Sequence, residues 1–82
     1  MTRLPWIKKY LNGFLYYDLK INGVFISMEQ RPHYCDRGNW IVKIIDPGPM
    51  SIDSSDLFPR YYFDFEIARC EVHSFLKKRG VI

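Results

Sequence analysis

The sequence predicts an α+β fold, in which an antiparallel sheet of three to four strands carries one C-terminal helix on one face. Three observations predict it: an alternating pattern around an Asn-Gly dipeptide at residues 22–23, a β-branched run at residues 40–45, and a helical pattern at residues 65–79. Because so short a chain buries only one modest core, we expect one compact domain over residues 1–82.

The segment Phe14–Glu29 predicts a β-hairpin. Asn22-Gly23 is a two-residue turn in which both residues accept a positive φ, a strong hairpin signal. The flanking residues alternate between two sides of the strands. The more apolar side carries Leu15, Tyr17, Leu19, Ile21, Val24, Ile26 and Met28. We expect this side to face the core.

A third strand is predicted at Trp40–Ile45, because the run is short and rich in β-branched residues. The prolines of "DPGP" end it, since proline cannot donate to a strand ladder. Residues 46–60 then form the longest predicted loop, a length that is often functional. "RYYF" at residues 60–63 is expected to be a short edge strand.

The helix is predicted from Phe65 to Arg79. Asp64 suits the N-cap, and Gly80 suits the residue just past the C-terminal end. One helix face carries an apolar stripe that should pack on the sheet: Phe65, Ala68, Val72, Phe75 and Leu76.

The only two cysteines and two histidines form two close pairs, His33-x-Cys35 and Cys70-x-x-His73. Zinc accepts four such ligands in a tetrahedron. However, Cys70 and His73 lie far from the apolar stripe of the helix, so they should face solvent, away from the first pair. We therefore expect no metal. If the chain does hold zinc, these four residues are the ligands, and the protein is a small zinc-stapled binding domain.

The sequence gives little evidence for catalysis or for cofactor binding. The chain lacks a glycine-rich phosphate loop, and a base two residues from Cys35 is poorly placed to activate it. We expect no cofactor and no enzymatic activity. A net charge of +3 is only mildly basic. We find no signal-peptide core and no apolar run of membrane-spanning length, which predicts a cytoplasmic protein with reduced thiols.

The second face of the predicted sheet carries aromatic rings interleaved with lysines. We name five residues on it as a candidate binding site: Phe14, Tyr16, Lys20, Phe25 and Lys43. Such a face can stack bases and neutralise phosphates, or it can form a protein interface. Alternatively, "PWIKKYL" at residues 5–11, which is compatible with a short N-terminal helix opening at Pro5, folds over this face and buries it.

Strands followed by one helix ending in "FEIARCEVHSFLKKRG" resemble the arm-type DNA-binding domains of phage tyrosine integrases. The resemblance covers residues 14–79 and implies DNA binding, with Ala68, Phe75 and Leu76 at the matching helix positions. The loop "DPGPMSIDSSDLFPR" departs from it, because its acidic residues would repel a DNA backbone.

"RPHYCDRGNW" and "FPRYYFDFEIARCEVHSFLKKRG" are also similar to small proteins of unassigned function encoded by phages and prophages. This resemblance covers most of residues 30–80 and implies a mobile-element setting with no defined activity; if the chain is phage-encoded, its compartment is the cytoplasm of a bacterial host. We expect such an accessory protein to bind a host protein or protein complex, for instance as an inhibitor of host defence. A nucleic-acid-binding module is the alternative.

Overall fold

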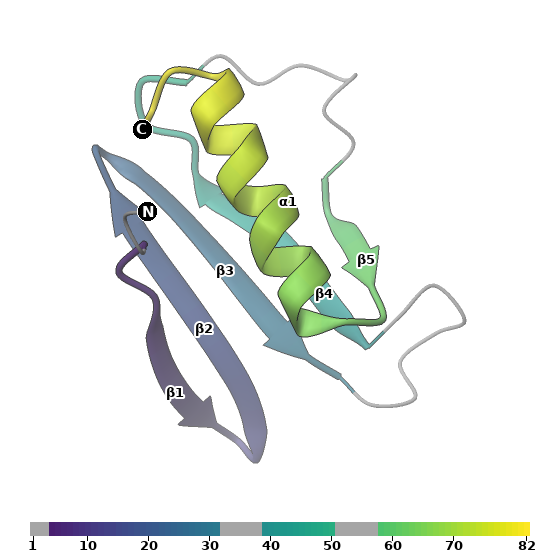
Figure 1. The fold of residues 1–82 in the computed structure, drawn as a ribbon. Coiled ribbons are helices and arrows are strands. Elements are labelled where there is room, and N and C mark those ends of the chain that lie inside the picture. Colours follow the sequence, from purple (N-terminus) through teal and green to yellow (C-terminus); the bar gives the residue numbers. More distant parts are fainter. Residues whose placement is uncertain (1–3, 32–38, 51–57) are drawn as a thin grey trace.

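The computed structural model describes residues 4–31, 39–50 and 58–82. It has an α+β layout, in which an antiparallel five-stranded sheet with strand order β1-β2-β3-β4-β5 carries one C-terminal helix (Figure 1). The elements are β1 (Ile7–Leu11), β2 (Phe14–Ile21), β3 (Val24–Gln30), β4 (Trp40–Asp46), β5 (Arg60–Tyr62) and α1 (Phe65–Lys78). The predicted fold class is confirmed, with one strand more than expected.

The additional strand is β1, and the short N-terminal helix expected at residues 5–11 was wrong. Asn12-Gly13 is a second two-residue turn, with φ angles of 53° and 81°. It joins β1 to β2 in the same way that Asn22-Gly23, with φ angles of 48° and 83°, joins β2 to β3. Such a turn lays the preceding residues alongside the next strand, where their backbone groups find hydrogen-bonding partners.

The predicted hairpin has the predicted register. Ile21 lies opposite Val24, and Tyr16 lies opposite Glu29. The β3–β4 pair is antiparallel as well, with a bulge where the register shifts between Phe25 and Ile26.

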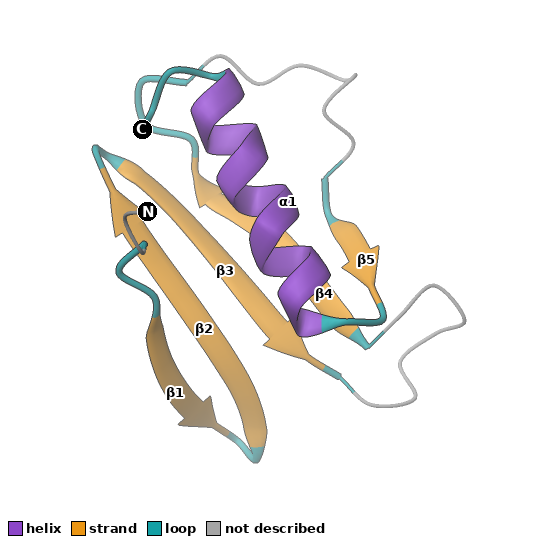
Figure 2. Cartoon of the chain, viewed as in Figure 1, coloured by secondary structure: helices purple, strands orange, loops and turns teal. Residues whose placement is uncertain are grey.

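Helix α1 lies across one face of the sheet, over β4 and beside β5 (Figure 2). Asp64 caps it as predicted, because its carboxylate accepts hydrogen bonds from the N–H groups of Glu66, at 2.7 Å, and Ile67, at 3.3 Å. The predicted apolar stripe is buried except for Phe65, which is half-buried. The buried core contains Leu19, Val24, Ile26, Met28, Trp40, Val42, Ala68, Val72, Leu76 and Val81.

Aromatic rings close the end of the core at the helix N-terminus. The Phe65 ring lies 4.6 Å from the Tyr17 ring and 4.9 Å from the Trp40 ring, centroid to centroid. Leu4 and Trp6 also pack against the core. Residues 4–11 therefore extend the sheet and support its helix side, and they do not fold over the opposite face.

The C-terminal end is held against the β2–β3 turn. The Val81 N–H donates to the Leu76 carbonyl at 2.9 Å, and the Asn22 side-chain amide donates to the Val81 carbonyl at 2.6 Å. Among residues 4–31, 39–50 and 58–82, no helix is long and apolar enough to cross a membrane.

Candidate protein-interaction surface

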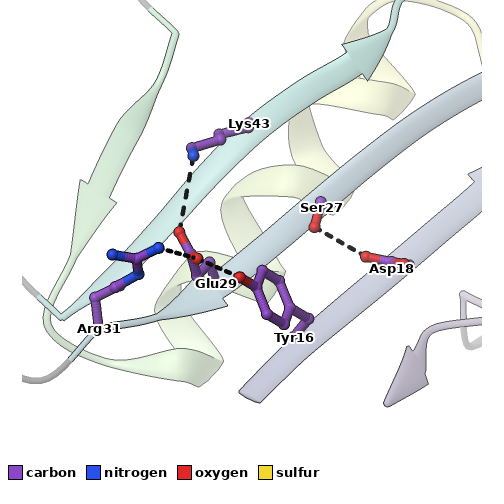
Figure 3. Close-up of polar contacts among 6 residues, drawn as sticks. All are labelled: Tyr16, Asp18, Ser27, Glu29, Arg31 and Lys43. Carbon is purple, nitrogen blue, oxygen red and sulfur yellow. Dashed lines mark hydrogen bonds and ion pairs between the residues drawn. The ribbon is translucent and has the colours of Figure 1, made fainter. Parts of the chain in front are cut away.

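The candidate site is the sheet face opposite α1, which we call the open face. Strand alternation and register assign residues to it. Its described members include Ile7, Lys9, Leu11, Phe14, Tyr16, Asp18, Lys20, Phe25, Ser27, Glu29, Arg31, Ile41, Lys43 and Tyr61. Figure 3 shows six of them on the side of the sheet away from the helix.

The structure places all five predicted site residues on the open face. Lys20 and Lys43 are exposed, and Phe14, Tyr16 and Phe25 are half-buried. They do not form one cluster. Phe14, Tyr16 and Lys43 gather around a buried carboxylate, whereas Lys20 and Phe25 lie together near the β2–β3 turn.

The buried carboxylate is Glu29, which is only 5% exposed and joins three neighbouring side chains (Figure 3). The Tyr16 hydroxyl donates to Oε1 at 2.6 Å, and the Arg31 guanidinium lies 2.9 Å from the same oxygen. The Lys43 ammonium lies 3.7 Å from Oε2. Ile41, opposite Glu29 on β4, is 2% exposed, so this part of the open face is closely packed.

Burial alone would raise the pKa of Glu29. The hydrogen bonds from Tyr16 and Arg31 and the charges of Arg31 and Lys43 outweigh burial, so the pKa of Glu29 lies below its ordinary value. The hydrogen bond to Glu29, together with burial, raises the pKa of Tyr16. The hydrogen bond to Glu29 also raises the pKa of Arg31. We call these four side chains the Glu29 group; it consists of the Glu29 carboxylate, the neutral Tyr16 phenol and the cations of Arg31 and Lys43.

A second polar group lies between β1 and β3. Asp18 accepts a hydrogen bond from the Ser27 hydroxyl at 2.8 Å, and the Lys9 ammonium lies 2.7 Å from its other oxygen (Figure 3 shows Asp18 and Ser27). The same ammonium lies 5.7 Å from the centre of the Tyr16 ring. This group therefore continues the Glu29 group across β2.

Aromatic rings contact the remaining charges. The Arg31 guanidinium lies 4.4 Å from the centre of the Phe14 ring, and the Lys20 ammonium lies 4.8 Å from the centre of the Phe25 ring. The described cations of the open face thus each lie against a carboxylate, a ring or both.

Sequence reasoning missed the residues that organise this face. Glu29 ends the predicted hairpin but was given no role, although the Asn22-Gly23 turn places it opposite Tyr16. Lys9 was missed because its strand was not predicted. Arg31 lies just past the end of β3, where alternation gives no signal.

The four metal-ligand candidates are only partly described. Cys70 is exposed on α1 and His73 is half-buried, while His33 and Cys35 lie outside the described residues. Within the ranges that the structure describes, we find no group of three or more His, Cys, Asp or Glu side chains placed to hold a metal ion. The absence of metal stays a prediction.

Comparisons with known proteins return no match to a family model, to a curated protein or to a solved structure.

Proposed function

We propose that this chain is a non-enzymatic binding module that docks a partner protein on the open face of its sheet. In the setting that its phage-like sequence features imply, the partner is a host protein or protein complex, and binding inhibits it. One observation carries the proposal: the open face combines half-buried aromatic rings with cations that already have partners within the chain.

The paired charges favour a protein over a nucleic acid. Nucleic-acid affinity comes mainly from cations that neutralise phosphates and release counterions. Here Asp18 and Glu29 contact three of the cations on the open face, Lys9, Arg31 and Lys43, so a phosphate would compete with these carboxylates. Protein interfaces, in contrast, are enriched in Tyr, Phe and Arg. Side chains already held by neighbours also lose less conformational freedom on binding.

The same contacts argue against acid–base catalysis on this face. A general acid or base works best with a pKa near the operating pH. Glu29, the buried carboxylate, has a lowered pKa and three partners, so it stays ionised and engaged at neutral pH. Its contacts are those of a structural ion pair that fixes the shape of the surface.

The test compares two truncations to alanine, one on each side of the molecule. Phe25→Ala removes a half-buried ring from the open face, and Ile67→Ala removes a 56% exposed side chain from α1. Tagged wild-type protein and both variants are incubated with lysate of a bacterial host, with and without nuclease. We expect wild type and Ile67→Ala to retain one nuclease-resistant partner, and Phe25→Ala to lose most of it.

Two outcomes contradict the proposal. If nuclease removes the captured material, and the purified chain binds oligonucleotides with a steep salt dependence, then the nucleic-acid alternative is correct. If Ile67→Ala loses the partner while Phe25→Ala keeps it, then the docking surface lies on the helix. Circular dichroism of each variant verifies that the fold is intact.

A further inference from the structure

The outer edge of β1 is unusual among the surfaces of this chain. β1 stands at the end of the strand order, and all five of its residues are exposed. Ile7, Tyr10 and Leu11 are 65%, 69% and 52% exposed. The strand at the opposite edge, β5, has only three residues. Within the described part of the chain, no element pairs with the free side of β1.

The turn geometry shows which backbone groups of β1 are unpaired. A two-residue turn makes Leu11 and Phe14 a hydrogen-bonded pair, and such pairs alternate with non-hydrogen-bonded pairs along the ladder. Lys9 and Ile7 therefore bond to β2. Lys8 and Tyr10 direct their N–H and C=O groups away from β2, toward the free edge.

Exposed edges are usually protected by proline, a bulge or lysines. β1 contains neither proline nor a register shift, so its lysines are its protection. Both lysines already have partners. The Lys9 ammonium lies 2.7 Å from Asp18, and the Lys8 ammonium lies 5.7 Å from the centre of the Tyr10 ring. The charge of Lys9 is therefore balanced by a carboxylate, and the charge of Lys8 lies near an aromatic ring.

We propose that a second copy of this chain pairs with β1 in the antiparallel direction, with the two-fold axis at Lys9. The sequence "IKKYL" is self-complementary in this register. Ile7 then lies opposite Leu11 of the second copy, and Lys8 lies opposite Tyr10 of the second copy, on each side of the axis. Apolar residues meet apolar residues, and lysines meet aromatic rings.

This register also satisfies the backbone. Each Lys8–Tyr10 pair joins two residues whose free N–H and C=O groups point toward the edge, so each pair exchanges two hydrogen bonds. At the centre the two Lys9 side chains face one another, and the adjacent Asp18 of each copy balances them. A two-fold axis on Lys8 would instead place Lys8 opposite its own copy, with no carboxylate in contact.

The dimer joins two five-stranded sheets edge to edge. Because the axis runs perpendicular to the sheet, both helices lie on one side and both open faces on the other. The open face is thereby doubled in area and presents two identical sets of side chains. The proposal of a dimer rests only on the properties of the β1 edge and does not depend on what the open face binds.

The test is the solution mass by light scattering coupled to size exclusion, from micromolar to millimolar protein. We expect the wild-type chain to approach twice its 9.9 kDa mass as concentration rises. Tyr10→Lys would place a lysine opposite Lys8 of the second copy, and we expect a monomer. Adding Lys8→Glu to that variant creates two cross-strand ion pairs in the same register, and we expect the dimer to return.

Ile67→Lys is the matched control, because it places a lysine on an exposed apolar residue of α1, away from the edge. We expect it to dimerise like wild type. A wild-type chain that stays monomeric at millimolar concentration overturns the proposal. A dimer that survives Tyr10→Lys, fails to return in the double variant, or is lost in Ile67→Lys also overturns it. Far-ultraviolet circular dichroism shows whether each variant is folded.

Discussion

Truncating Phe75 to alanine tests how α1 is docked on the sheet. The side chain is 8% exposed, and its ring centre lies 5.2 Å from the ring centre of Phe58. The guanidinium groups of Arg79 and Arg60 lie 5.2 Å and 5.6 Å from the ring centre. A buried Phe→Ala change costs about 3–5 kcal/mol. We expect the lower end, about 3 kcal/mol, because this ring is not fully buried.

That loss is large for this chain. At about 0.05–0.15 kcal/mol per residue, 82 residues give a stability of about 4–12 kcal/mol. A loss of about 3 kcal/mol lowers the thermal midpoint by about 12–24 °C in a domain of this size.

The assay is urea unfolding followed by tryptophan fluorescence, since Trp40 is buried. The control is Ile67→Ala, an exposed position on the same helix, which should change stability by less than about 0.5 kcal/mol. Equal urea midpoints for Phe75→Ala and Ile67→Ala would refute this orientation of α1.

Three further predictions concern the turns, the buried carboxylate and metal. Gly48→Ala should destabilise the chain more than Gly13→Ala in urea unfolding. Both glycines have positive φ, but a Cβ at Gly48 would lie 2.2 Å from the Gly23 carbonyl oxygen, whereas one at Gly13 meets nothing within 4 Å; equal losses would contradict this packing. Glu29 has a pKa below its usual 4.5 in the folded state, so its stabilising effect is complete above about pH 4.5 and is lost as the pH falls further. The difference in free energy of unfolding between wild type and Glu29→Gln should therefore narrow below that pH. A constant difference would count against a lowered pKa for Glu29. Finally, the purified chain should carry no stoichiometric zinc and should stay folded in chelator; one zinc per chain by elemental analysis, with unfolding on chelation, would reverse that prediction.

The fold was readable from the sequence where local signals agreed with one another. The β2–β3 hairpin followed from alternation around Asn22-Gly23, and the helix followed from the Asp64 cap together with its apolar stripe. β1 was missed because all its residues are exposed, so it shows no apolar alternation, and Pro5 suggested a helix start. The identical Asn-Gly pair at residues 12–13 carried the missing signal.

The candidate site could be predicted from the sequence only where strand alternation assigns side chains to a face. Alternation placed the predicted aromatic residues and lysines on one face. It could not show that Lys43 on β4 approaches Glu29 on β3, because that contact depends on how β3 aligns with β4. That alignment includes a bulge at Phe25, and a bulge leaves no reliable mark in the sequence.

Direct contact on the open face is the central claim, and site-specific photocrosslinking in a bacterial host measures it. A photoreactive phenylalanine analogue replaces Phe25 on the open face in one variant and Ile67 on α1 in the other. We predict one discrete, nuclease-resistant protein adduct from position 25 and none of that mass from position 67. An adduct from position 67 alone, or a position-25 adduct that nuclease digests, would contradict the account.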